Sequence, residues 1–205
     1  WNGNWYYSSD TITTTGLFTS NSVSSGSAWN LYYEDDFEGT IGSEWNTTSS
    51  IYYNNTNILG NFGQTVPSVS LNLNNLPLHD SIKVEFDLYI LDSWDGNAHV
   101  DLWNFIIEND TLIRATFVNF GTTIPQSYPD NYDASNIIGH PKYFGAIDSL
   151  MPSFCWDTIT PELVSSLYQI NKSHQHTSTS LSIDLISETS QPLCDESWGI
   201  DNIRV

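Results

Sequence analysis

The sequence predicts an all-β protein, an antiparallel sandwich of two sheets. Short segments rich in β-branched and aromatic residues follow one another along the chain, separated by Gly, Asn, Asp and Ser. Sustained apolar repeats with the 3.6-residue period of a helix are almost missing. Regularly spaced strands without intervening helices favour antiparallel pairing over the parallel sheets of α/β proteins.

The clearest strand is the central one, at residues 82–90. Polar residues occupy one face, and the other face carries only apolar residues: Ile82, Val84, Phe86, Leu88 and Ile90. A short helix is predicted at 161–168, because Pro161 suits a first helical turn. Further strands are expected at residues 31–38, 50–53, 58–62, 68–73, 100–107, 111–119, 181–187 and 202–205.

A chain of 205 residues suits one domain of this kind. Residues 1–30 begin with aromatic side chains and continue as a Ser/Thr-rich run, which predicts an N-terminal arm or linker. Residues 31–205 are then the β-sandwich domain. The chain begins at Trp1 without the basic and apolar regions of a signal peptide, so we expect a piece of a larger protein.

The charge balance is strongly acidic. The 24 Asp and Glu residues face 5 Lys and Arg residues, for a net charge of −19. Nucleic acid and anionic membrane surfaces are therefore excluded as expected partners. No apolar run reaches the roughly 18 residues of a membrane helix, so membrane insertion is not expected. Bound divalent cations would relieve the self-repulsion of such a chain, and solubility alone is the alternative explanation.

Cys155 and Cys194 are the two cysteines, and they suit a single disulfide in an extracellular protein. Two free buried thiols are the alternative. Four Asn-x-Ser/Thr sequons permit glycosylation without arguing for it, because a chain this rich in Asn, Ser and Thr produces several by chance: Asn46, Asn54, Asn109 and Asn171.

A first acidic cluster surrounds Asp36 and Glu38. If this segment pairs with the last strand, these carboxylates approach Asp201, and backbone carbonyls could complete a calcium site of six to eight oxygens. An ordinary charged strand end is the alternative.

A second acidic cluster follows the central strand. Asp92, Asp95 and Asn97 surround a turn-forming glycine, as in many calcium loops, although the spacing is not that of the helix-loop-helix site. The remaining ligands could come from Asp101, or from Asp195 and Glu196. The alternative is a hairpin turn whose carboxylates cap backbone N–H groups.

A pair of histidines and a pair of carboxylates are further candidates for metal binding and for catalysis. His174 and His176 share one side of a strand, a geometry that suits zinc or copper, but without a third ligand nearby we expect two solvent-facing histidines. Retaining glycosidases need two carboxylates. Glu85 and Asp87 resemble half of the Glu-x-Asp-x-x-Glu strand of laminarinase-type enzymes, but Ile90 stands where the second Glu is required, so no enzyme is predicted.

A long, proline-broken segment from residue 121 to about 160 is rich in aromatic side chains. Loops of this length in a compact domain usually carry function. Four aromatic residues in it could stack on a sugar ring, or else pack structurally: Tyr128, Tyr132, Tyr143 and Trp156.

Several motifs together resemble the concanavalin-like β-sandwich modules of large bacterial and protist surface or secreted proteins. They are 59–63 (LGNFG), 71–77 (LNLNNLP), 84–90 (VEFDLYI), 92–96 (DSWDG), 126–129 (QSYP) and 196–202 (ESWGIDN). The 36–39 motif (DFEG) and the terminal strand also resemble calcium-stabilised, carbohydrate-binding jelly rolls.

This resemblance implies a jelly-roll sandwich at the cell surface or outside the cell, with calcium as its cofactor. We therefore expect a carbohydrate-binding or adhesion module whose partner is a glycan or an extracellular protein. One alternative is a structural subunit that self-assembles into an extracellular filament or coat, and the other is a glycoside hydrolase.

Overall fold

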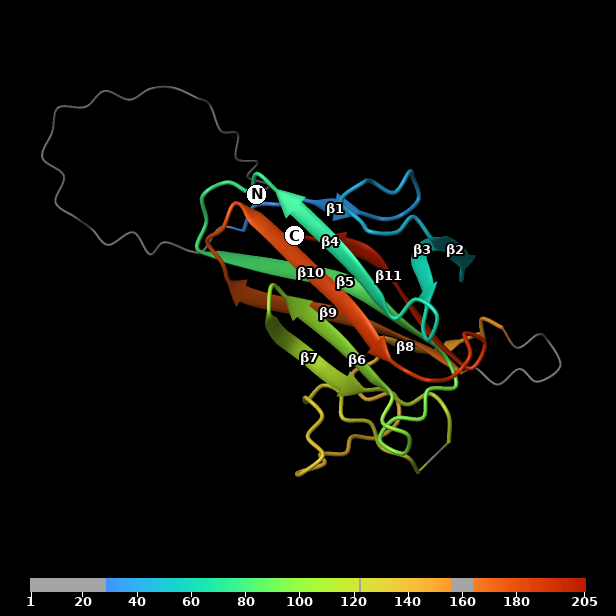
Figure 1. Ribbon diagram of the computed structural model, residues 1–205. Helices are drawn as coiled ribbons and strands as arrows, with labels where there is room; N and C mark the ends of the chain where they lie inside the picture. Colours follow the sequence, from blue (N-terminus) through green and yellow to red (C-terminus); the bar gives the residue numbers. More distant parts are fainter. Residues whose placement is uncertain (1–28, 122, 156–163) are drawn as a thin grey trace, which may run out of the picture.

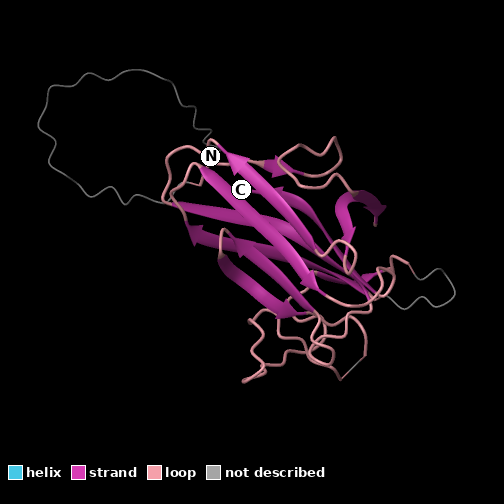
Figure 2. Ribbon diagram, viewed as in Figure 1, coloured by secondary structure: helices cyan, strands magenta, loops and turns pink. Residues whose placement is uncertain are grey.

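The computed structural model describes residues 29–121, 123–155 and 164–205 (Figure 1). The N-terminal arm up to residue 28 and the predicted sugar-stacking Trp156 lie outside these ranges. The described residues form strands, turns and loops, as Figure 2 shows, so the predicted all-β class is confirmed. Over the same ranges there is no helix with the length and hydrophobicity needed to cross a membrane.

Eleven strands are assigned within the described ranges, and every pairing between them is antiparallel. They are β1 (Glu34–Asp35), β2 (Ser50–Tyr53), β3 (Thr56–Phe62), β4 (Ser68–Asn74), β5 (Ser81–Asp92), β6 (Leu102–Ile107), β7 (Asp110–Thr116), β8 (Asp148–Met151), β9 (Ser165–Gln175), β10 (Ser180–Glu188) and β11 (Glu196–Arg204).

The strands form two sheets. The larger one has the order β2-β3-β11-β5-β9-β8, with β1 paired to β11, and the smaller one has the order β4-β10-β6-β7. Their inner faces share one apolar cluster, to which β5 contributes Val84, Phe86 and Leu88, and β10 contributes Ile183 and Leu185. The predicted alternation of apolar and polar residues at 82–90 is therefore confirmed, because its apolar residues form the buried face of β5.

The predicted helix at 161–168 is wrong over its described part. Val164 precedes β9, and Ser165 to Tyr168 form the beginning of that strand. The hydrophobicity pattern did not indicate a strand here because Ser165 and Ser166 are polar yet fully buried. The buried Ser166 hydroxyl donates to Asn119 Oδ1 at 2.6 Å. Strands β8 and β9 were both missed.

The strand directions give the sandwich two distinct ends. Strands β5, β7 and β10 finish at one end, which we call the loop end; its described residues are 93–101, 117–121, 123–147, 152–155 and 189–195. Three shorter connections, 75–80, 108–109 and 176–179, form the opposite hairpin end. Figure 1 shows the long loops gathered below the sheets, away from the C-terminus. The predicted disulfide Cys155–Cys194 is confirmed, and it lies at the loop end.

Candidate metal centre

Three carboxylates converge at the loop end. Asp95, Asp101 and Glu196 each bring a ligand oxygen to within 4.8 Å of those of the other two, and we call this group the acidic centre. Asp95 and Asp101 lie on the loop that joins β5 to β6, and Glu196 is the first residue of β11, opposite Asp92 of β5. Residues far apart in the chain therefore meet because β11 pairs with β5.

A tight turn folds the β5–β6 loop onto itself. The amide of Ala98 donates to Asp95 O at 3.2 Å, and the amide of Val100 donates to Gly96 O at 3.1 Å. Gly96 has a φ of 60°, and a Cβ at this position would lie 2.7 Å from the carbonyl oxygen of Pro125. Only glycine fits this position without displacing the backbone of the neighbouring loop. The turn returns the chain so that Asp101 comes beside Asp95.

Two of the three carboxyl groups are buried, which makes their ionised forms unfavourable. Asp101 is 4% exposed and Glu196 is 0% exposed. Burial, and then the neighbouring Asp101 carboxyl group, raise the pKa of Glu196 to about 9. Burial also raises the pKa of Asp101, and its Oδ2 atom has no hydrogen-bond partner. At the rim, the exposed His99 places its Nε2 3.9 Å from Asp95 Oδ2, which makes an ion pair when the imidazole is protonated.

Neutral polar groups from the β10–β11 connection complete the surroundings. The Thr189 hydroxyl donates to Glu196 Oε2. The Gln191 side-chain nitrogen Nε2 donates to Glu196 Oε1 at 3.1 Å and to Asp95 Oδ2 at 3.3 Å. The centre therefore offers carboxylate and hydroxyl oxygens, which are among the ligands that Ca²⁺ prefers. This donor set fits a hard divalent cation.

The other two residues of the predicted second cluster lie outside the acidic centre. Asp92 Oδ1 accepts the Ser153 hydroxyl at 2.5 Å and the Phe154 amide at 2.9 Å, so Asp92 anchors the segment before the disulfide. Asn97 Oδ1 accepts the Thr116 hydroxyl at 2.5 Å, which anchors Asn97 to the end of β7. Of the three predicted residues, Asp95 is the one that belongs to the acidic centre.

The first predicted cluster contains a second, smaller group of carboxylates. Strand β1 pairs with β11, as expected, with Asp35 opposite Ile203. The Thr56 hydroxyl lies 2.9 Å from Glu38 Oε1 and 3.0 Å from Asp201 Oδ2, and so bridges these two groups. Asp36 instead caps its own turn, because its Oδ1 accepts the Glu38 amide at 3.2 Å.

Asp201 is the buried member of this second group. It is 2% exposed, and burial raises its pKa to about 6, with further contributions from the Asp87 and Glu38 carboxylates. Hydrogen bonds from Asn57 and Thr56 lower the pKa of Glu38. The pair is therefore one buried acid beside one well-solvated carboxylate.

The predicted sugar-stacking tyrosines are half-buried in the structure. The Tyr128 ring packs against Phe117, with centroids 4.9 Å apart, and against Tyr168 at 5.1 Å. The Tyr143 hydroxyl donates to the carbonyl oxygen of Asn119 at 3.3 Å, and the Tyr132 amide donates to a β7 carbonyl. These contacts hold the long segment against the sandwich.

Other apolar side chains of the same segment face the solvent. We call them the apolar loop surface: Phe120, Ile137, Ile138, Phe144 and Ile147, which are between 42% and 60% exposed. Sequence reasoning missed them because it weighed tyrosine and tryptophan only. The four sequon residues, Asn46, Asn54, Asn109 and Asn171, are all exposed.

Comparisons of the chain with protein-family models, with curated proteins and with solved structures find no match in any of the three. The chemistry of the acidic centre is therefore the basis on which a function can be assigned.

Proposed function

We propose that this chain is a calcium-binding extracellular β-sandwich that acts as a carbohydrate-binding or adhesion module of a larger surface protein. The observation that carries the proposal is the acidic centre, where Asp101 and Glu196 are buried beside Asp95. Its oxygen donors match those of a calcium site.

Buried carboxylates in contact require a positive partner. Asp101 and Glu196 cannot both be ionised at this separation without a large electrostatic cost. Either a proton remains on Glu196, whose pKa is raised to about 9, or a cation replaces that proton. A divalent ion neutralises the centre and also reduces the self-repulsion of a chain with a net charge of −19. Calcium is therefore the expected occupant in a calcium-rich extracellular medium.

Hydrogen bonds join the loop of the acidic centre to the segment that carries the apolar loop surface. Asn97, two residues after Asp95, donates its amide to Pro125 O at 2.9 Å and its side-chain amide to Ile138 O at 3.3 Å. An ion that fixes the β5–β6 loop would therefore also fix the segment that carries the apolar loop surface. Binding through this surface is expected to depend on calcium.

The disulfide supports an oxidising compartment, because such bonds persist outside the cytosol. The resemblance to concanavalin-like surface modules supports an extracellular location. We propose that the module is not an enzyme. Glu85, the carboxylate that resembles a glycosidase residue, accepts the Asn171 side-chain amide at 2.7 Å and pairs with Lys83 on the polar face of β5.

The test is binding to a glycan array and to intact cells, in calcium and in excess chelator. We expect binding only in calcium, and a loss of at least tenfold in Phe144→Ser, because its ring is 48% exposed on the proposed contact surface. Leu78→Ser is the matched control, since Leu78 is fully exposed in the β4–β5 connection at the hairpin end. Polysaccharide turnover, or ordered self-assembly without affinity for glycans or cells, would overturn the proposal.

A further inference from the structure

Two histidines face each other at the hairpin end, far from the acidic centre. His79 lies in the β4–β5 connection, and His176 follows β9 directly. The distance from His79 Nε2 to His176 Nδ1 is 2.7 Å, the ring planes differ by 15°, and the centroids lie 5.0 Å apart. The expectation that His176 faces the solvent is wrong, because it is 7% exposed.

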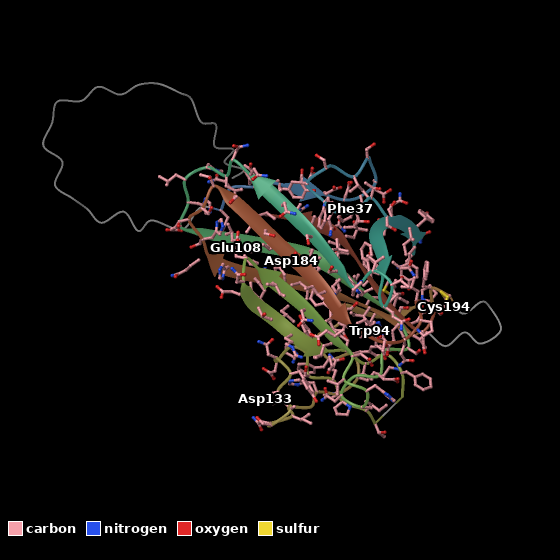
Figure 3. The ribbon with its side chains drawn as sticks, viewed as in Figure 1. Phe37, Trp94, Glu108, Asp133, Asp184 and Cys194 are labelled. Carbon is pink, nitrogen blue, oxygen red and sulfur yellow. A yellow bond between two sulfur atoms is a disulfide. The ribbon has the colours of Figure 1, made fainter. Side chains whose placement is uncertain are left out.

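The outer nitrogen of each ring faces an acceptor. His79 Nδ1 lies 2.6 Å from the carbonyl oxygen of Pro77, which can only accept, so this nitrogen carries the proton. His176 Nε2 makes no hydrogen bond within the described residues, but it lies 3.6 Å from Glu108 Oε1, and the negative charge of that carboxylate favours a proton on this nitrogen. Glu108 is held in place, because its Oε1 accepts the Ser182 amide at 3.1 Å. Figure 3 shows Glu108 at this end and Trp94 towards the other.

These contacts leave two lone pairs directed at each other. A neutral imidazole has one N–H group, which the Pro77 carbonyl fixes at Nδ1 of His79 and which the charge of Glu108 favours at Nε2 of His176. The two inner nitrogens then repel each other at 2.7 Å unless a positive species lies between them. Such a species is either a shared proton or a metal ion.

We propose that His79 and His176 form a second metal site, which binds a borderline transition-metal ion such as Zn²⁺ or Cu²⁺ through Nε2 and Nδ1. Histidines that bind metals direct their other N–H group to a backbone carbonyl or a carboxylate. His79 does so with the Pro77 carbonyl, and His176 Nε2 faces the Glu108 carboxylate at 3.6 Å without a hydrogen bond. Imidazole nitrogens suit these ions, whereas the oxygen donors of the acidic centre suit calcium. The two sites therefore differ in ion preference.

The geometry requires only a small adjustment. Zinc–nitrogen bonds of about 2.0–2.1 Å at a tetrahedral angle need the two nitrogens about 3.3 Å apart. His79 is half-buried in a connection between strands, so its ring can move outward, and water can complete the coordination. The neighbouring His174 takes no part, because its Nε2 pairs with Asp110 Oδ2 at 3.4 Å. The ion would join the β4–β5 connection to the end of β9.

The test is calorimetric titration of the whole chain with Zn²⁺ and with Cu²⁺, at pH 7.4 in saturating calcium so that the acidic centre is filled. We expect one high-affinity equivalent, and a loss of at least tenfold in affinity in His79→Gln and in His176→Gln. His174→Gln is the matched control, two residues away on the same strand, and should bind as the wild type does.

Nitrogen NMR of the wild-type histidines gives a readout that does not depend on variant folding. Zinc should shift His79 Nε2 and His176 Nδ1 while the outer nitrogens remain protonated. The proposal is overturned if neither ion binds and the spectra show a proton shared between the two rings. It is equally overturned if both glutamine variants bind the metal as tightly as the wild type.

Discussion

Glu196 shows how one buried side chain can link folding, pH and cation binding. Its pKa rises from 4.5 to about 9 in the folded protein, mainly because the carboxyl group is buried. Between these values the folded state binds one more proton than the unfolded state. The contribution of this group to stability is therefore fully present below pH 4.5 and is lost as the pH rises towards 9. Burial raises the pKa of Asp92 and of Asp101 too, which acts in the same direction.

Replacing Glu196 by Gln should remove most of this pH dependence, because glutamine has the shape of the protonated acid and cannot ionise. In chelator, the wild-type free energy of unfolding should fall between pH 6 and pH 8 at up to about 1.4 kcal/mol per pH unit. The Glu196→Gln variant should match the wild type near pH 5 and exceed it at pH 8. Urea unfolding at the three pH values measures this, and parallel curves for the two proteins would contradict it.

At the scale of elements, β11 holds the larger sheet together by pairing with both β3 and β5. It lies tightly against β3 at Gly199, where a Cβ would lie 2.8 Å from Ile58 Cδ1 and 2.9 Å from the carbonyl oxygen of Leu59. The backbone atom cannot move away without disturbing the ladder of hydrogen bonds. The absence of a side chain at this position is therefore a packing requirement.

Gly199→Ala should lower the free energy of unfolding by about 1–3 kcal/mol, the range for overpacking a well-packed interior. Gly39→Ala is the matched control, because nothing lies within 4 Å of a Cβ at that position. Chemical denaturation of both variants measures their free energies of unfolding. A Gly199→Ala protein as stable as the control would show that β3 and β11 are not held this closely.

The disulfide is the second element-scale prediction. Cys155 and Cys194 are 39 residues apart in the sequence, so the bond restricts the unfolded chain and contributes roughly 4 kcal/mol in the chain-entropy model. Cys155→Ser and Cys194→Ser should each lose much of this amount, and the double variant should lose no more than either single one. Thermal unfolding of the three variants measures it, and labelling of two thiols in the unreduced wild type would contradict the bond.

The sequence was most informative where one face of a strand is buried and the other is solvated. Strands β5 and β10 alternate in this way and were predicted. Strand β9 was missed because it begins with the buried polar residues Ser165 and Ser166 and then carries polar residues outward. Alternation of hydrophobicity cannot identify a strand whose buried positions are polar and satisfied by hydrogen bonds.

The acidic centre was predictable in part for a similar reason. Asp95 was identified from its loop, and Asp101 and Glu196 were named as residues that could complete the site. Their convergence depends on the turn at Gly96 and on the pairing of β11 with β5, which are tertiary features. The assignment of Asp92 and Asn97 to the same site assumed that neighbours in sequence share one ligand, whereas buried hydrogen bonds direct these side chains elsewhere.

The whole molecule has two chemically distinct ends. The loop end carries the acidic centre, the disulfide and the apolar loop surface, and the hairpin end carries the histidine pair. With a net charge of −19, like charges repel one another throughout the folded chain. A cation bound at the loop end would reduce this repulsion. Calcium at a hundred times its dissociation constant would add about 2.7 kcal/mol to the stability of the folded protein.

Calorimetric titration of calcium into the wild type and into Asp101→Asn tests the central claim most directly. Asp133→Asn is the control, because Asp133 lies exposed in the long loop and bonds Ser135 (Figure 3). We expect wild-type affinity to rise between pH 6 and pH 8 as the Glu196 proton is displaced, and to fall at least tenfold in Asp101→Asn but not in Asp133→Asn. Wild-type calcium affinity in Asp101→Asn would contradict the assignment of the acidic centre as the calcium site.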